Sequence, residues 1–381
     1  MRELQVALIG GGFMGRAHSL AYAVAPLAAD LGARIVPEVL VDVDADLAAR
    51  QARQLGWRRS GTDWRAAITD PAIDIVDICT PPQFHEEIAL AAMAAGKHVF
   101  CEKPISNSAE ESRRMAAAAR EAGVVTQVGF NYRHTPAISF ARQLLDSGKL
   151  GAPLQFRGAY LQETAFGADP HRWRAKRATG GSGMVGDIGS HVIDMAEMLL
   201  GDVVRVAARV RAWVPGTEGW TDESVRLGED LVDDGGVWVA EFASGVIGSF
   251  AVNAAASGRK NQVRFELDAT RGAVEFNWND KELLRVSYTD ESADHRGFRT
   301  IHTNDQHPDG WWRLAGLGTG YVDVSAIQFQ KFVRAILAGG QASPSFADAA
   351  HIQGVVEAIH AAAVTDRWVD VPVRTERKVL A

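Results

Sequence analysis

The chain is poor in the features that mark membrane-bound or disulfide-stabilised proteins. It has only two cysteines, Cys79 and Cys101. Both fall at the ends of predicted buried strands, which predicts core thiols and argues against a disulfide framework. No uninterrupted apolar run approaches the roughly 18–20 residues of a membrane span, and Met1–Leu4 leads into an apolar strand without a signal-peptide pattern. We therefore expect a cytoplasmic protein with no membrane partner.

An excess of positive charge is also absent. Lys and Arg number 40 against 47 Asp and Glu, which gives a net charge of −7. Binding to nucleic acid needs clustered basic surface, so we expect no nucleic-acid partner. The composition, 47% hydrophobic and 23% charged, is that of a globular protein. A length of 381 residues exceeds the roughly 250–300 at which single cores stop growing, which predicts two domains.

The first third of the chain alternates between predicted strands and helices. Strands are expected at 4–9, before Asp42, and at 73–79, 98–101 and 124–129, with a helix after 15 and helices at about 45–55, 84–95 and 109–121. Strands that alternate with helices of this length indicate parallel βαβ units. We therefore predict a doubly wound parallel sheet of the Rossmann type over residues 1–130.

Beyond residue 130 the pattern changes. A helix near 136–147 and a strand near 154–163 precede a stretch from 203 to 290 in which apolar and polar residues alternate. That period of two predicts an open, mostly antiparallel sheet with one face covered. Helices are expected at about 322–338 and 347–364, and the C-terminal part, about 345–381, is expected to pack back on the first domain. The fold class is α/β, with a second α/β domain over 131–381.

A glycine-rich turn follows the first strand. Gly10, Gly12 and Gly15, with Phe13 and Met14 between them, open the first helix. In the dinucleotide fingerprint such glycines allow a tight turn, approach of the backbone to a pyrophosphate and close packing of helix on strand. A purely structural turn is the alternative interpretation.

A carboxylate at the end of the second strand supports the nucleotide interpretation. Asp42 can accept hydrogen bonds from both ribose hydroxyls and repel a 2′-phosphate, which favours NAD over NADP. It lies further from Gly15 than the usual distance of about 20 residues, so we expect an extra surface loop around 25–35. Asp44 is the alternative acid, and either could be a solvated turn carboxylate.

Charged and rigid residues follow the later strands. Glu102 and Lys103 end a buried strand and are followed by Pro104. A lysine at the carboxyl end of a parallel strand costs desolvation unless it contacts a ligand, so Lys103 is our first candidate for a catalytic residue. Thr80, Pro81, Pro82 and His85 could lie over the nicotinamide ribose, or Pro81-Pro82 could simply begin a helix. Residues 131–133 could face the same cleft or form a hinge.

A second glycine-rich segment, 180–191, carries Asp187 and His191 four residues apart at the start of a helix. Both side chains then project from one face, and the helix dipole favours the carboxylate. A histidine beside a carboxylate is a natural acid and base for a sugar hydroxyl. The alternative is a capping aspartate and a packed histidine. Asp194 and Glu197 extend the helix and are expected to be solvated or interface charges.

Ten tryptophans could supply faces that stack on sugars, although most should lie in the core. Trp173, in the segment 171–174 before the glycine-rich loop, is the candidate for the site. Trp311 and Trp312 are weaker ones.

Taken in order, the motifs at 10–15, Asp42, 80–82, 102–104, 131–133 and 186–191 resemble the Gfo/Idh/MocA oxidoreductases over nearly the whole chain. The segments 10–22, 157–162, 296–300 and 343–348 are similar to the levoglucosan dehydrogenase-like branch of that family. The resemblance implies that Lys103, Asp187 and His191 form a catalytic trio, that the Lys103–Pro104 bond can be cis, and that the open sheet builds the interface of a homo-oligomer, a dimer or tetramer. It also implies sugar contacts from Tyr132, Gln162 and Trp173, beside the trio itself.

We therefore predict an NAD-dependent dehydrogenase that oxidises a secondary hydroxyl, at C3, of a pyranose, an anhydrosugar such as levoglucosan, or a glycoside. The alternatives are an inositol dehydrogenase, a non-catalytic sugar or nucleotide sensor, and an enzyme that retains its cofactor and moves hydride between two sugars. No metal is expected. The residues predicted to contact the cofactor are Gly10, Gly12, Phe13, Met14, Gly15, Asp42, Thr80, Pro81, Pro82, His85, Glu102, Lys103, Asn131 and Arg174.

Overall fold

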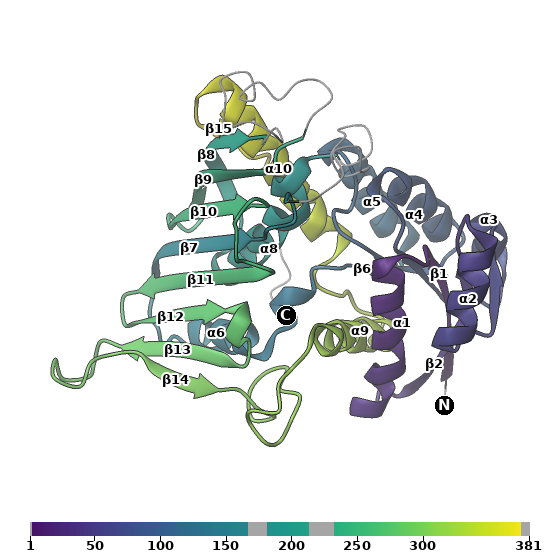
Figure 1. The fold of residues 1–381 in the computed structure, drawn as a ribbon, viewed down its shortest axis with the longest axis horizontal. Helices are drawn as coiled ribbons and strands as arrows, with labels where there is room; N and C mark the ends of the chain where they lie inside the picture. The colour runs from purple at the N-terminus through teal and green to yellow at the C-terminus, as the bar shows by residue number, and fades with distance from the viewer. Residues whose placement is uncertain (1, 167–180, 213–231, 375–381) are drawn as a thin grey trace. The chain divides into compact units, whose positions relative to one another are not determined.

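The computed structural model describes residues 2–166, 181–212 and 232–374 (Figure 1). The chain divides into two compact units. The first contains the residues up to Asn131 together with Gly320–Ala350, and the second contains Tyr132–Thr319 together with His351–Arg377. Within the described ranges, no helix combines the length and the apolar character that crossing a membrane requires.

The first unit is built on six parallel strands in the order β3-β2-β1-β4-β5-β6, as predicted for a doubly wound sheet. The central strand β4 is buried at all four positions, as expected of a strand covered on both faces. The strand order reverses between β1 and β4, which is where folds of this type bind ligands. The strands are β1 Arg2–Ile9, β2 Ala33–Val41, β3 Arg59–Gly61, β4 Ile75–Ile78, β5 His98–Cys101 and β6 Thr126–Val128.

The helices between these strands begin and end at residues that local chemistry favours. Asp44 caps α2 by accepting from the Leu47 N–H, and Ser108 caps α5 by accepting from the Glu111 N–H. Gly56 and Gly123 end the same helices in the left-handed conformation. The elements are α1 Phe13–Ala28, α2 Ala45–Leu55, α3 Trp64–Thr69, η1 Pro82–Phe84, α4 His85–Ala94 and α5 Ala109–Ala122.

The surface loop expected around 25–35 is wrong. Helix α1 continues to Ala28 and β2 begins at Ala33, so a long helix and a nine-residue strand take up the extra length before Asp42. The short elements β3 and α3 were not predicted. Each spans few residues and is largely exposed, so neither has a long apolar pattern in the sequence.

Helix α9, Tyr321–Ala338, lies beside α1 (Figure 1). Its Phe329 ring lies 4.1 Å from that of Tyr22, and its Phe332 ring lies 5.6 Å from that of Phe100. This aromatic packing groups Gly320–Ala350 with the first unit, although we expected these residues in the second domain. Residues His351–Arg377 group with the second unit. Packing of the C-terminal part on the first domain stays a prediction.

The second unit contains a nine-stranded mixed sheet in the order β14-β13-β12-β11-β7-β10-β9-β8-β15. Only the pair β7 and β10 is parallel. The strands are β7 Pro153–Leu161, β8 Val203–Arg211, β9 Gly235–Phe242, β10 Ile247–Asn253, β11 Gln262–Ala269, β12 Gly272–Asn277, β13 Leu283–Tyr288, β14 Arg299–His302 and β15 Val369–Asp370.

One face of this sheet is covered, as its alternating pattern predicts. Along β9, Trp238, Ala240 and Phe242 are buried, whereas Val237 and Val239 are exposed. Helices α6, Pro136–Asp146, and α8, Ser190–Leu200, pack against the buried face (Figure 1). The remaining elements are η2 Asn131–His134, η4 Val185–Gly189, η5 Trp278–Asp280 and α10 Phe346–Thr365.

Candidate functional site

The three glycines of the predicted fingerprint, Gly10, Gly12 and Gly15, have different roles where β1 meets α1. Gly10 has φ +103, and a Cβ there would lie 2.7 Å from the Cys79 carbonyl. A Cβ on Gly15 would lie 2.0 Å from the Gly10 oxygen, so helix and turn need both glycines to pack. At Gly12, the N-cap of α1, an added Cβ would meet no atom of the described residues within 4 Å. Packing therefore does not require Gly12, and its open position at a helix N-terminus suits an anion.

The two carboxylates after β2 have different local roles. Asp42 accepts hydrogen bonds from the Gly11 N–H at 2.7 Å and the Asp44 N–H at 3.1 Å, so it lies against the glycine turn. Asp44 caps α2. Asp44 therefore has a structural role as a capping residue, and Asp42 is the acid that lies beside the glycine turn.

The loop after β4 is braced by His85, which is completely buried. Its Nε2 lies 2.7 Å from the Thr80 oxygen and its Nδ1 lies 3.1 Å from the Pro104 oxygen. Burial lowers the pKa of His85, because the charged form loses its hydration. The imidazole thus joins the 80–82 loop to the segment after β5, a positioning role that the sequence pattern did not predict. Direct contact between His85 and a cofactor stays a prediction.

The segment after β5 carries the predicted catalytic lysine. The Lys103–Pro104 bond is cis, as the family resemblance implied, and a second cis bond joins Ser343 and Pro344. Glu102 is buried, and its Oε2 accepts the backbone N–H of Lys103 at 3.0 Å. A Cβ on Gly129 would lie 2.4 Å from Glu102 Oε1, so the carboxylate is packed against the end of β6.

Among the residues that the structure describes, five buried side-chain polar atoms of the first unit have no hydrogen-bond partner: Gln51 Oε1, Thr80 Oγ1, Asn107 Oδ1, Gln127 Oε1 and Asn131 Oδ1. Of these, Thr80 and Asn131 are positions at which a cofactor contact was predicted. Asn131 donates through Nδ2 to Ser325 on α9 at 3.1 Å. Buried polar atoms are normally satisfied, so an orphaned hydroxyl and an orphaned carbonyl indicate a place for a polar ligand. With the open Gly12 and the acid Asp42, these atoms fit a dinucleotide.

In the second unit, the predicted pair Asp187 and His191 lies where a π-helical turn, η4, meets α8. Asp187 is half-buried and His191 is 4% exposed. π-turns within helices often mark functional sites. The buried Asp233 caps this segment: its Oδ1 accepts the Val185 N–H at 2.9 Å, and its Oδ2 lies 2.9 Å from His360 Nε2.

The glycines before Asp187 also have packing roles. A Cβ on Gly183 would lie 2.4 Å from Asp233 Oδ2, and one on Gly186 would lie 1.8 Å from Ser182 Oγ. Packing within the unit therefore explains both residues, and they are not evidence that a ligand comes close.

Aromatic and amide side chains surround His191. The Tyr132 ring meets the His191 ring edge to face at 4.8 Å and the Trp278 ring at 4.6 Å. The Tyr132 hydroxyl lies 3.0 Å from that of Tyr160 and accepts from Asn261 Nδ2 at 2.8 Å. Gln162 Nε2 donates to Asn261 Oδ1 at 2.8 Å. The structure thus brings the predicted Tyr132, Gln162 and His191 together.

Sequence reasoning missed three members of that cluster: Tyr160, Asn261 and Trp278. Tyr160 lies near the end of β7, two residues before Gln162, so the alternation of side chains along the chain was an available signal. Asn261 directly precedes β11 and Trp278 directly follows β12, both far along the chain, and no motif marks them. The predicted Trp173 and Arg174 lie outside the described residues. Of the weaker candidates, Trp312 is 45% exposed and donates to the Gly318 oxygen at 2.9 Å.

The solvated positions expected for Asp194 and Glu197 are wrong. Both side chains are 1% exposed. Asp194 forms an ion pair with Arg133, whose Nε donates to it at 2.8 Å. Glu197 lies 3.0 Å from His351 Nε2 and 3.1 Å from Arg374. The helix is buried on most sides, so its charges are paired internally.

Comparisons with known proteins agree with this geometry. Residues 4–130 match the family described as "Oxidoreductase family, NAD-binding Rossmann fold", and residues 138–275 match the "GFO/IDH/MocA C-terminal domain". A levoglucosan dehydrogenase of Pseudarthrobacter phenanthrenivorans is 42% identical over 388 aligned positions, which cover 98% of this chain and 99% of the relative.

Solved structures and a more distant relative extend the comparison. A structure of levoglucosan dehydrogenase in complex with NADH and levoglucosan matches with a TM-score of 0.90 at 42% identity, covering 97% of this chain and 100% of that one. A scyllo-inositol 2-dehydrogenase (NAD⁺) of Bacillus subtilis is 32% identical over 202 positions, 52% of this chain and 54% of the relative.

Proposed function

Because the chain belongs to the Gfo/Idh/MocA family of NAD-binding oxidoreductases, we propose that it oxidises a secondary hydroxyl, at C3, of a pyranose, an anhydrosugar such as levoglucosan, or a glycoside. The observation that carries this proposal is the cluster around His191. A buried imidazole there adjoins two tyrosine rings and a network of hydroxyl and amide groups. Such groups both donate and accept hydrogen bonds, as recognition of a polyol requires.

The proposed reaction divides the work between the two units. NAD, when bound, supplies the hydride acceptor for the sugar carbon. His191 takes the hydroxyl proton as the C–H bond breaks, and Asp187, on the same helical segment, orients the imidazole. Lys103 stabilises the developing alkoxide with a fixed positive charge. Tyr132 and Gln162 hold further hydroxyls of the sugar.

A cyclitol is the second candidate substrate. The observation in its favour is the 32% identity to a scyllo-inositol dehydrogenase, although that match covers half of the chain. A ring of secondary hydroxyls would need the same acid-base group and the same polar neighbours. The match to levoglucosan dehydrogenase, which covers nearly the whole chain, favours the sugar.

We further propose a homo-oligomer, a dimer or a tetramer, in the cytoplasm. The uncovered face of the large sheet exposes Val237, Val239 and Ile247. Apolar side chains grouped on one sheet face are typical of a protein interface. Both cysteines are unpaired, which suits a reducing compartment.

The experiment is an NADH-formation screen over levoglucosan, glucose, 1,5-anhydroglucitol, inositols and glucosides, with NADP in parallel. We expect turnover with NAD on a pyranose or anhydrosugar. Turnover on inositols alone would favour the cyclitol, and absence of turnover over the whole panel would favour a sensor. Bound nicotinamide that survives dialysis would favour the cofactor-retaining enzyme.

The role of His191 is tested by His191→Ala on the best substrate. Loss of its acid-base assistance should lower kcat by about 10²–10⁴-fold, with NAD affinity unchanged. His307→Asn is the matched control, because His307 packs beside Phe140, outside the cluster. Near-normal turnover of His191→Ala would refute the assignment.

A further inference from the structure

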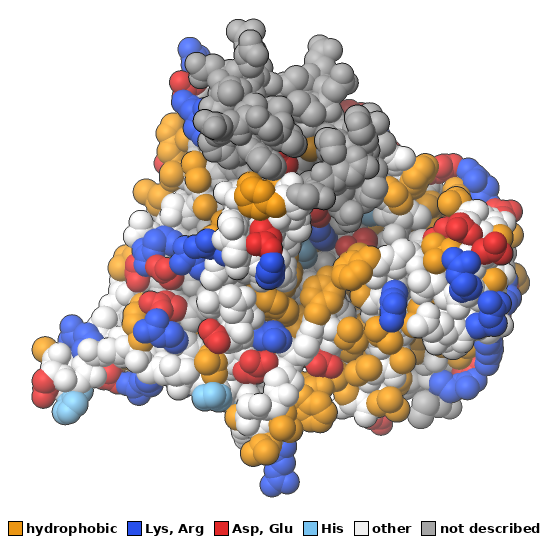
Figure 2. Space-filling view, viewed as in Figure 1, with side chains coloured by type: hydrophobic (Ala, Val, Ile, Leu, Met, Phe, Trp, Pro, Cys, Tyr) orange, Lys and Arg blue, Asp and Glu red, His pale blue; other side chains and the backbone are white. Residues whose placement is uncertain are grey.

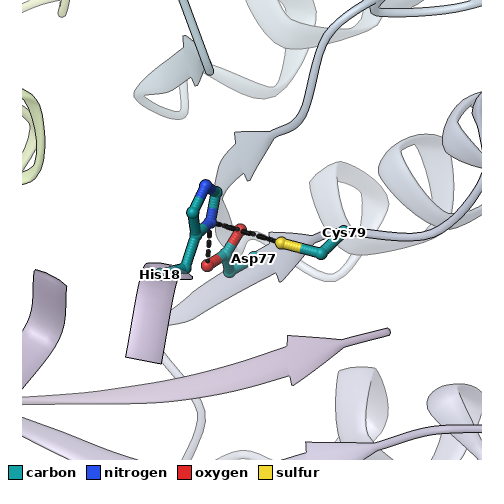
Figure 3. Close-up of side chains that lie close together, drawn as sticks. All are labelled: His18, Asp77 and Cys79. Atoms are coloured by element: carbon teal, nitrogen blue, oxygen red, sulfur yellow. Dashed lines mark hydrogen bonds and ion pairs between the residues drawn. The ribbon is translucent and has the colours of Figure 1, made fainter. Parts of the chain in front are cut away.

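A buried histidine for which no role was predicted connects the core of the first unit to the Lys103 segment. His18 lies on α1, one turn after Gly15, and is 6% exposed. Its Nδ1 lies 2.9 Å from Asp77 Oδ2 on β4 (Figure 3). Its Nε2 lies 3.1 Å from Glu102 Oε1, directly after β5. One imidazole therefore spans a carboxylate on β4 and a carboxylate that directly follows the adjacent parallel strand β5.

The surroundings of His18 are almost entirely buried. Asp77 is 0% exposed and also accepts a hydrogen bond from the Tyr22 hydroxyl, and Cys79 Sγ lies 3.2 Å from His18 Nδ1. Phe100 closes the other side with its ring 5.2 Å from the imidazole. Each polar atom of this cluster thus has a partner within it, which accounts for the geometry shown in Figure 3 without a metal ion.

This geometry fixes the protonation of the imidazole. A neutral histidine has one N–H and can donate to one carboxylate only, whereas both ring nitrogens here face carboxylate oxygens. Burial alone would lower the pKa of His18, but Asp77 and Cys79 raise it well above its ordinary range. The ionisable groups that face it are Asp77, Cys79, Tyr22 and Glu102. An imidazolium also offsets the charge of the two carboxylates in the core.

The far end of this chain of hydrogen bonds is the backbone of Lys103. Glu102 uses Oε1 for His18 and Oε2 for the Lys103 N–H at 3.0 Å. The carboxylate occupies the space that a side chain at position 129 would need, since a Cβ on Gly129 would lie 2.4 Å from Oε1. The orientation of the peptide from which the Lys103 side chain leaves therefore depends on where His18 holds Glu102.

We propose that His18 is a positioning residue for the reaction: bridging Asp77 and Glu102, it fixes the Glu102 carboxylate and, through it, the backbone of Lys103. This inference rests on the proposed function of Lys103 in stabilising the alkoxide. Its partner Asp77 anchors the imidazole from the sheet, so the geometry of the lysine is set from the core of the first unit. A displacement of about 1 Å at a reacting group can cost about 10²-fold in rate.

Two substitutions of His18 each keep one of its two hydrogen bonds, to Asp77 or to Glu102, and remove the other. The amide nitrogen of Asn takes approximately the place of histidine Nδ1, and that of Gln the place of Nε2. His18→Asn should therefore keep the bond to Asp77 and lose the one to Glu102, and His18→Gln should do the reverse. We expect His18→Asn to lower kcat by about 10²-fold with little change in the KM for NAD, and His18→Gln to retain most of the activity.

A purely structural role would give a different result. Activity would then follow the thermal midpoint of each variant, and His18→Gln, which loses the buried Asp77 partner, would be no better than His18→Asn. Equal losses in the two variants, or losses that follow stability, overturn the inference. Glu102→Gln provides the coupling test: combined with His18→Asn it should cost no more than either change alone. If the losses in kcat multiply in the double variant, His18 and Glu102 act independently, which contradicts the inference.

Two further measurements keep the test decisive. If a His18 variant does not fold, nitrogen NMR of the labelled wild-type protein reports the ring directly. Both nitrogens should be protonated at pH 7, and a neutral ring overturns the proposal.

Lys103→Met separates this inference from the proposed function. Normal turnover of Lys103→Met refutes the role of the lysine, and with it the inference. A strong loss there, together with equal losses in His18→Asn and His18→Gln, refutes the inference alone.

Discussion

At the scale of single residues, Asp42 and Asp44 show how two neighbouring carboxylates acquire different roles. Asp42 holds the glycine turn by accepting from Gly11 and is the proposed partner of the ribose, whereas Asp44 caps α2. The sequence could not separate them, because both are acids after the same strand. Only the hydrogen bonds identify the capping residue.

We expect Asp42→Asn to increase the use of NADP relative to NAD. The amide oxygen can still accept from Gly11, but the negative charge that repels a 2′-phosphate is gone. The measurement is kcat/KM for both cofactors. Asp44→Ala is the control: it should reduce the free energy of unfolding by about 0.5–2 kcal/mol through the lost cap, with cofactor preference unchanged. A stronger shift in Asp44→Ala than in Asp42→Asn would reverse the two roles.

At the scale of elements, the turn between β1 and α1 permits a paired test of structure against binding. Gly12→Ala adds a methyl group that meets no atom of the described residues within 4 Å, so the fold should be unaffected. Because the backbone there would approach a pyrophosphate, we expect weaker NAD binding. Gly15→Ala brings a Cβ 2.0 Å from the Gly10 oxygen and should cost about 1–3 kcal/mol of stability.

The two readouts are the dissociation constant for NAD and the free energy of unfolding. Normal NAD binding by Gly12→Ala would contradict the proposal that the pyrophosphate lies against this turn. A Gly15→Ala protein with unchanged stability would contradict the packing described here.

A buried ion pair joins Glu197 on α8 to His351 on α10. Its contribution to the free energy of unfolding should depend on pH. Burial lowers the pKa of His351, but Glu197 and Asp202 outweigh this and the opposing effect of Arg374, so the pKa is raised. A raised pKa means that the folded state binds the proton more tightly. The stabilisation is therefore complete below about pH 6.5, the ordinary value, and is lost as the pH rises through the folded-state pKa.

The loss of stability caused by His351→Gln, relative to the wild type, should therefore be largest below about pH 6.5. It should become smaller as the pH rises toward 9. The measurement is the free energy of unfolding in denaturant at several pH values. A difference that stays constant or grows with pH would show that His351 is not the charged partner of Glu197.

Elements with local signals were predictable, and those that depend on distant contacts were not. The parallel strands, α2 and α5 have apolar periodicity and capping residues within a few positions of their ends. The π-turn at Val185–Gly189 and the cap from Asp233 have no such signal, because the capping residue lies far along the chain. For the same reason the sequence did not indicate a role for His18, whose partners are Asp77 on β4 and Glu102 directly after β5.

At the scale of the whole molecule, charges of both signs intermingle on the face seen in Figure 2, consistent with the slightly negative net charge. The uncovered face of the large sheet is different, with Val237 and Val239 exposed on β9 beside Arg157, which pairs with Glu266 and Asp268. A sheet face with exposed apolar and paired charged side chains is suited to contact a second copy.

If that face forms the oligomer, Val237→Asp with Val239→Asp should reduce the mass measured by light scattering to that of a smaller species. The two new carboxylates would be buried without partners in the interface. Val43→Asp is the matched control, because Val43 is 95% exposed in the first unit. An unchanged mass in the sheet variant, or dissociation of the control, would contradict the proposed interface.

The central proposal is that Lys103 and His191 act on one hydroxyl of a sugar. The most direct measurement is a crystal structure of the protein with NAD and the best substrate of the screen. The account predicts Lys103 Nζ and His191 Nε2 both within about 2.6–3.2 Å of the oxygen of the reacting hydroxyl. A complex in which either group lies too far from that oxygen to share it, with the sugar bound in a productive pose, would contradict the claim.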